Sequence, residues 1–414
     1  MSENYSQVAR KITLILFAAQ SLGSAGFIAA ATINAIAGAK LSGQPAWAGV
    51  PSSVYQIGGA LAAFGWGYGM DRLGRRGGLT LGLVFGVLGA GLAGEALIAQ
   101  SFGLFLCGMV FMGAANSALQ LGRFAAAEVN PPTQRGRAIS NVVIGGTMGA
   151  IFGPLMVGPM GDWSKNLGLD ELSGPYVASL VLFGIAAIVI WMLLRPDPRD
   201  IGREVARLYP DATPRGPARS IPTILRQPAT QVAMASMVVG QLTMVMLMTI
   251  TSLHMKDHNH ALGDISFVIS SHTFGMYAFS IISGRLVDRF GRAPIIVVGA
   301  ITLILACLTA PLSPDVLPIS VALFLLGLGW NFCYVGGSTL LADQLSPSER
   351  ARTQGFNDFV IGLTSGVGSL SSGVIFAALG YATVGVVGAL VTALPIALTL
   401  WWSFGRRAEL QRAS

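Results

Sequence analysis

Long apolar stretches alternate with short polar segments along all 414 residues of the chain. Each stretch holds roughly the 20 mostly apolar residues that an α-helix needs to cross the hydrocarbon core of a bilayer. The twelve stretches lie at 10–38, 46–70, 77–99, 102–126, 138–160, 173–194, 229–253, 263–286, 294–311, 316–342, 354–378 and 382–404. They lack the two-residue alternation of a barrel strand, so the pattern predicts an all-α membrane protein with twelve transmembrane helices.

The composition supports this class. Only 11% of the residues are charged and 53% are apolar, whereas about a quarter of a soluble domain is charged. This excludes a water-soluble enzyme, a disordered chain and a nucleic-acid-binding protein, and it makes the lipid bilayer the first expected partner. The three cysteines lie far apart in apolar stretches and predict neither disulfides nor a metal site. No acid–base or nucleophile constellation occurs in the spans, so we expect neither enzymatic activity nor a prosthetic group.

The distribution of lysine and arginine predicts the orientation. With a cytoplasmic N-terminus, only Lys40, Lys165 and Lys256 of the 26 basic residues would face outward. Because cytoplasmic loops are enriched in basic residues, we expect both termini in the cytoplasm. The net charge of +7 is then a topology signal rather than an anion-binding surface. The N-terminus lacks a cleavage site of the signal-peptide kind, so we expect the first span to be retained.

The chain is predicted to contain two similar halves. A polar connection at 195–228 separates six spans in 1–194 from six spans in 229–414. Gly67-Tyr-Gly-Met-Asp-Arg-Leu-Gly-Arg-Arg76 recurs 217 positions later as Gly284-Arg-Leu-Val-Asp-Arg-Phe-Gly-Arg292. A second segment, from Glu128 to Ala138, recurs about 215 positions later from Asp343 to Arg352. Two features that repeat at nearly one offset indicate an internal duplication.

Charged residues in these repeated segments are candidates for gating. Asp71, Arg72 and Arg75 follow span two, and a carboxylate beside guanidinium groups can form charge-assisted hydrogen bonds to a neighbouring loop. We expect Glu128 and Asp343 to be the partners, in clusters that close the inner side. The remaining candidates for gating or proton coupling are Asp288, Arg289 and Asp358. The alternative is that these basic residues only anchor the helix ends.

Histidine and methionine gather in one region. All four histidines lie within 19 positions, and the membrane spans there contain two pairs with four-residue spacing, Met244/Met248 and His272/Met276. This spacing places both members of a pair on one helix face. Thioether and imidazole donors without a carboxylate form a soft ligand set that suits Cu(I). The connecting outer loop is a candidate capture site, through His254, Met255, His258 and His260. The alternatives are a methionine that fills the core and a histidine that binds a carbonyl group.

The repeated loops resemble the signature loops of the major facilitator superfamily. This resemblance covers essentially the whole chain and implies two six-helix bundles that alternate access by rocking. The four-residue set Met244, Met248, His272 and Met276 resembles the motif of the CcoA-like copper importers of that superfamily. It implies copper import through a bacterial inner membrane for cytochrome oxidase assembly. The implied partners are the copper ion, protons and copper carriers in the cytoplasm or periplasm.

Two other cargoes stay open. Relatives in this branch are similar to riboflavin transporters, and aromatic or amide side chains could contact a flat ring system. These are Trp330, Asn331 and Tyr334 in span ten with Tyr55 and Gln56 in span two. The glycine and proline residues of span five resemble those of proton-coupled exporters of drugs or metabolites. Position 109, where such exporters carry an arginine, is Met109, which disfavours export.

Overall fold

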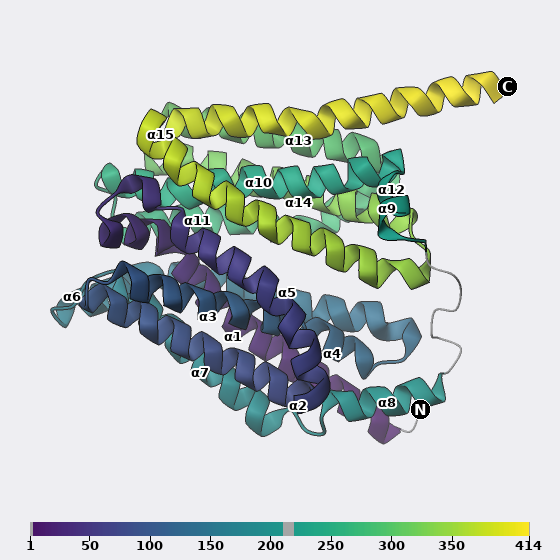
Figure 1. Ribbon diagram of the computed structural model, residues 1–414, viewed down its shortest axis with the longest axis horizontal. Coiled ribbons are helices and arrows are strands. Elements are labelled where there is room, and N and C mark those ends of the chain that lie inside the picture. Colours follow the sequence, from purple (N-terminus) through teal and green to yellow (C-terminus); the bar gives the residue numbers. More distant parts are fainter. Residues whose placement is uncertain (1–2, 210–218, 414) are drawn as a thin grey trace. The chain divides into compact units, whose positions relative to one another are not determined.

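The computed structural model describes residues 3–209 and 219–413, and all regular elements in these ranges are helices (Figure 1). The longer helices follow the apolar stretches of the sequence, because a bilayer offers no hydrogen-bond partners to a backbone that is not helical. Ten of the described helices are long and apolar enough to cross a membrane. Arg215 of the predicted linker lies outside the described residues.

The helices have the following bounds: α1 Glu3–Ser42, α2 Val50–Ile98, α3 Phe102–Gln120, α4 Gly122–Glu128, α5 Arg135–Leu155, α6 Val157–Asn166, α7 Ser173–Leu193, α8 Pro198–Leu208, α9 Ile221–Leu225, α10 Pro228–Asp257, α11 Leu262–Tyr277, α12 Ser280–Phe290, α13 Arg292–Thr309, α14 Val316–Asp343 and α15 Pro347–Ala413. Short 3-10 turns lie at Pro45–Trp47, Pro132–Gln134 and Ala310–Leu312.

Two of these helices are hairpins of two spans each. The backbone of α2 leaves the helical conformation at Gly74, with φ +79°, and that of α15 leaves it at Gly380, with φ +80°. Both values lie in the left-handed region that glycine tolerates best. Figure 1 shows the second half of α15 running back along the first. With both hairpins divided, the described helices provide the twelve predicted spans, and the all-helical fold class is confirmed.

Two spans are broken where the sequence predicts one helix. Span five is divided into α5, which ends at Leu155, and α6, which begins at Val157. Pro159, in the first turn of α6, has no N–H group to donate to the carbonyl oxygen of Leu155, so the ladder is interrupted there. In span eight, the break lies between Tyr277 and Ser280. There the Asn331 amide donates to the carbonyl oxygen of Met276 at 2.6 Å, so a side chain of α14 is inserted into the helix ladder.

The described chain forms two compact units, Met1–Thr213 with Ala261–Ser266, and Pro214–His260 with Phe267–Ser414. We call them unit 1 and unit 2. In each unit one glycine lets two helices pack backbone to backbone. A Cβ atom on Gly113 would lie 2.2 Å from the carbonyl oxygen of Tyr55, and one on Gly327 would lie 2.2 Å from that of His272. The two units therefore share a packing frame.

Candidate functional site

His272 of α11 is fully buried in unit 2 against α14. Its Nδ1 lies 3.0 Å from the carbonyl oxygen of Leu323, so Nδ1 carries the proton and donates it. The other ring nitrogen, Nε2, is buried and has no hydrogen-bond partner. In this tautomer Nε2 presents a lone pair, which is the form in which an imidazole binds a metal ion. Nε2 of His272 is thus a buried candidate metal ligand, and the hydrogen bond made by Nδ1 fixes the orientation of the ring.

Met244 and Met248 follow, in four-residue steps, two residues of α10 that pack on α14. Ser236 donates to the carbonyl oxygen of Cys333 at 3.3 Å, and Gly240, one turn later, also lies against Cys333. Because α10 and α14 run in opposite directions, each further turn of α10 meets an earlier turn of α14. This register brings Met244 to the level of residue 329 of α14 and Met248 to the level of residue 325.

The α11 pair reaches the same two levels. His272 contacts Leu323 and Gly327, which puts it near the level of residue 325. Met276 lies against Gly327 and binds Asn331 through its carbonyl oxygen, which puts it near the level of residue 329. Met244 and Met276 are buried at one level, and His272 and Met248 lie at the next. The binding of one ion by all four stays a prediction.

The internal repeat provides a second view of these positions. In unit 1, Gly23 packs on Leu119 as Gly240 packs on Cys333, which aligns α1 with α10 at the 217-residue offset. The residues of unit 1 that correspond to Met244 and His272 are Phe27 and Tyr55. Their rings contact each other, with centroids 6.1 Å apart. The same frame therefore brings these two positions together in unit 1.

The predicted capture residues are only partly gathered. His254 stacks on Tyr381 at 4.2 Å between ring centroids, and its ring also meets those of His258 at 4.4 Å and Phe376 at 6.4 Å. His260 Nε2 donates to the carbonyl oxygen of Pro314 at 2.8 Å. Met255 is fully buried. Within the ranges that the structure describes, no three His, Cys, Asp or Glu side chains are close enough to hold a metal ion together.

Aromatic side chains surround Trp330 in unit 2. Its indole stacks on Tyr334 with 4.9 Å between ring centroids and meets Tyr277 in a T-shaped contact at 6.2 Å. Its Nε1 donates to Gln241 Oε1 at 2.7 Å. Asn331 is fully engaged in holding the break of span eight: its amide donates to Met276 and to Ser280, and its carbonyl accepts from Ser283. Asn331 is therefore structural here, whereas Trp330 and Tyr334 are half-buried.

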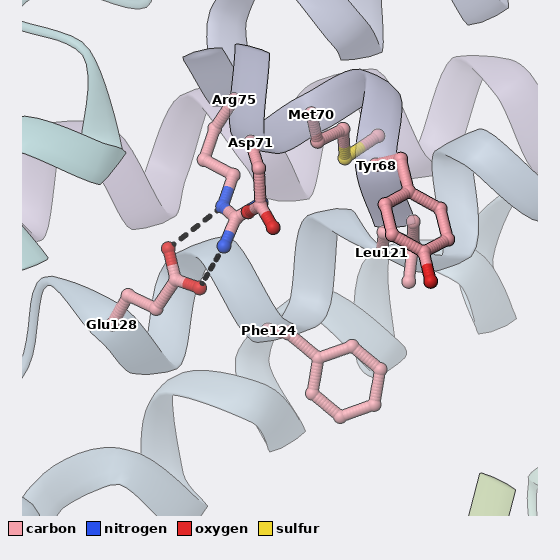
Figure 2. A pocket seen from close by; sticks show the side chains of 7 residues that line it. All are labelled: Tyr68, Met70, Asp71, Arg75, Leu121, Phe124 and Glu128. Atoms are coloured by element: carbon pink, nitrogen blue, oxygen red, sulfur yellow. Dashed lines mark hydrogen bonds and ion pairs between the residues drawn. The ribbon is translucent and has the colours of Figure 1, made fainter. Parts of the chain in front are cut away.

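The charged residues of the first repeat form an ion-pair cluster in unit 1 (Figure 2). Arg75 donates from Nε and Nη2 to the two carboxylate oxygens of Glu128 at 2.9 and 2.7 Å, and from Nη1 to Asp71 at 3.3 Å. Figure 2 shows these side chains at one end of a cavity of about 400 Å³ that Tyr68 and Phe124 also line. Arg72 is exposed and takes no part in the two hydrogen bonds between Arg75 and Glu128.

The corresponding cluster of unit 2 is simpler. Arg292 Nε donates to Asp343 at 2.9 Å, and these two residues occupy the positions of Arg75 and Glu128 in the repeat. Asp288 is exposed, and the guanidinium of Arg289 lies over the ring of Phe290 at 5.3 Å. Asp358, half-buried in α15, accepts from Gln354 at 2.9 Å.

Two carboxylates that sequence reasoning missed hold the ends of the linker. Asp197 accepts from the backbone N–H groups of Arg75 and Arg76, each at 3.1 Å, at the Gly74 break. Glu349 accepts from Nε and Nη2 of Arg219, both at 2.8 Å. The Arg219 hydrogen bonds, followed by the Ser346 and Arg219 backbone N–H groups, hold the pKa of Glu349 below its usual range. A signal for Asp197 was its place directly before Pro198, typical of a helix N-cap.

Comparisons with known proteins agree on one family. The family model described as Major Facilitator Superfamily matches residues 12–254 and 232–414. The MFS-type transporter YdeG of Bacillus subtilis strain 168 is 33% identical over 96% of this chain and 93% of its own length. The riboflavin transporter RfnT of Brucella anthropi is 30% identical over 91% and 92%. The solved nucleoside transporter NupG shares the fold, with a TM-score of 0.67 at 15% identity over 95% of this chain and 98% of NupG.

Proposed function

The chain belongs to the major facilitator superfamily, and from this premise we propose that it imports Cu(I) across the bacterial inner membrane. It is a multi-pass membrane transporter and not an enzyme. In this proposal Met244, Met248, His272 and Met276 hold the ion between α10 and α11. Both termini lie in the cytoplasm, and rocking of the two halves releases the ion there.

The unpartnered Nε2 of His272 is the observation that carries the proposal. A buried polar atom without a partner costs about 1–3 kcal/mol, and a bound ion would remove that cost. The hydrogen bond from Nδ1 to Leu323 has the form that commonly orients a metal-binding histidine, because it fixes both ring and tautomer.

The chemistry of the donors selects the ion. Thioether sulfurs and one neutral imidazole suit Cu(I), whereas Mg²⁺, Ca²⁺ and Mn²⁺ prefer oxygen ligands. Zn²⁺ would find one good donor in this set, since it is normally bound by thiolate, imidazole or carboxylate. These ligands carry no permanent charge, which keeps the affinity low enough for release. His254 and His258, adjacent at the end of α10, would meet the ion first.

Uptake of riboflavin is the second candidate. It is favoured by the similarity to RfnT along 91% of the chain and by the aromatic side chains around Trp330. Stacked rings with a nearby amide can hold a flat heterocycle. In this candidate His272 would serve to pack α11 on α14. Proton coupling through Asp358 is compatible with either cargo.

Radioactive copper and radiolabelled riboflavin uptake, measured in parallel in cells expressing the chain, test both candidates. His272→Asn keeps an N–H donor near the Nδ1 position and removes the Nε2 ligand, so copper uptake should fall to background. Met244→Leu with Met248→Leu should do the same, because leucine conserves volume but not the sulfur. Met156→Leu with Met160→Leu is the matched control: it has the same spacing in unit 1 and should leave uptake unchanged.

Equal protein levels in the membrane are required for each variant. Copper uptake that ignores the His272→Asn change would remove the ligand assignment. Riboflavin accumulation without any copper accumulation would replace the first candidate by the second.

A further inference from the structure

Trp330 of α14 meets both helices of the proposed copper site. Its Nε1 donates to Gln241 of α10 at 2.7 Å, and its ring meets Tyr277 of α11 at 6.2 Å between centroids. Gln241 precedes Met244 by less than one helical turn, and Tyr277 directly follows Met276. The indole therefore lies beside the level that Met244 and Met276 share.

The orientation of the indole is fixed. Tyr334 lies one turn further along α14 and stacks on Trp330 with an interplanar angle of 18°. A partner at this spacing covers the indole face that is directed toward the C-terminal end of α14. By the same helical geometry, the opposite face is directed toward the N-terminal part of α14, where Gly327 and Leu323 contact Met276 and His272. The hydrogen bond to Gln241 keeps the ring from rotating out of this position.

The electron-rich face of an indole attracts cations, and tryptophan does so more strongly than tyrosine or phenylalanine. The attraction increases when the cation has lost its water, as an ion between uncharged thioethers must. We propose that Trp330 is a further binding residue of this site and holds the monovalent soft ion through a cation–π contact with its face. This rests on the proposed copper function, because it places the ion at the level of Met244 and Met276.

The contact has a functional consequence. A bound ion with thioethers and imidazole on one side and an indole face on the other needs no anionic ligand to be held. Divalent ions, which keep their water more firmly, gain less from an indole face. Trp330 would therefore add selectivity for a monovalent soft cation, while Gln241 and Tyr334 act as positioning residues.

Titration of the purified full-length chain with Ag⁺ tests this, since Ag⁺ is a soft monovalent ion that does not change oxidation state on exposure to air. The readouts are tryptophan fluorescence and, independently, the Ag⁺ dissociation constant from equilibrium dialysis. We expect Ag⁺ to quench part of the fluorescence in a saturable way. Trp330→Phe should abolish that saturable part and weaken Ag⁺ binding by about 2- to 30-fold, the range that a cation–π contact provides. Trp401→Phe, at an exposed tryptophan of the same unit, should change neither.

Gln241→Leu provides a second variant that leaves Trp330 in place. It should reduce the quenching because the indole loses the hydrogen bond that orients it, even if Trp330→Phe fails to fold. Full quenching in Trp330→Phe, or Ag⁺ binding to the wild type without any quenching, would overturn the role of Trp330 and leave the copper function standing. A wild-type chain that binds no Ag⁺ would overturn both. If Ag⁺ quenches the wild type but no longer binds to His272→Asn, His272 is required for binding, and the role of Trp330 is then judged from Trp330→Phe alone.

Discussion

The two units pack their helices alike but differ in the side chains at the equivalent positions. In unit 1, Phe27 and Tyr55 occupy the places of Met244 and His272, and their rings contact each other. The closely packed glycines, Gly113 and Gly327, are retained in both units. Duplication therefore preserved the frame, whereas soft donors occupy these equivalent positions in unit 2 alone. A frame held by backbone contacts leaves the side chains that face away from it free to diverge.

The largest expected effect comes from giving unit 2 the residues of unit 1. Met244→Phe with His272→Tyr should reduce copper uptake at least about tenfold, because each change removes one soft donor. The frame should tolerate the pair, since unit 1 already accommodates it. Radioactive copper uptake at matched membrane levels is the measurement. If uptake persists, the difference between the units is unrelated to cargo.

The shared frame can be tested by adding one methyl group to each unit. Gly113→Ala and Gly327→Ala should each destabilise the protein by roughly 1–3 kcal/mol, because the new Cβ would lie 2.2 Å from a backbone carbonyl oxygen. Thermal unfolding in detergent, followed by circular dichroism, reports the change. Gly355→Ala, where a Cβ meets open space, is the control. A large effect in one unit only would show that the frames are not equivalent.

The repeated ion pairs should differ modestly. Arg75 forms a two-pronged contact with Glu128, whereas Arg292 reaches Asp343 through Nε at 2.9 Å. Glu128→Gln should therefore cost more than Asp343→Asn, with both changes within about 1 kcal/mol because the pairs are partly exposed. Thermal unfolding at low and high salt distinguishes them, since added salt should reduce each difference. Equal losses of stability in the two variants would show that the second hydrogen bond between Arg75 and Glu128 does not stabilise the protein further.

The ion pair between Glu349 and Arg219 predicts that the stability of the wild type and of a Glu349→Gln variant depends differently on pH. The pKa of Glu349 is lowered in the folded state by Arg219, so its carboxylate stabilises the fold above the unfolded pKa of about 4.3. That stabilisation is lost as the pH falls from there through the folded pKa. Glu349→Gln should therefore be less stable than the wild type at neutral pH, and the gap should narrow below about pH 4. Unfolding temperatures across this range measure the gap, and a constant gap would contradict the assignment.

Much of the candidate site was readable from the sequence because it depends on local spacing. Met244 and Met248, like His272 and Met276, are four residues apart, and helical geometry alone puts each pair on one face. The repeat offset likewise identified Glu128 and Asp343 as partners of the arginine-rich helix ends, and both accept from arginines in the structure. The arrangement of the predicted capture residues could not be predicted from the sequence as well, since the burial of Met255 depends on neighbours distant in the chain.

The sequence by itself determined the class, the spans and the duplication, because a bilayer forces every apolar stretch of sufficient length into a helix. Only the tertiary structure decided which atoms of those helices meet. In the folded protein, Asn331 donates to the backbone at the break of span eight, and Nε2 of His272 has no hydrogen-bond partner. Trp330 contacts both Gln241 and Tyr277. These contacts join residues 53 to 89 positions apart, and their register follows from glycine packing between helices, which spacing along the chain does not encode.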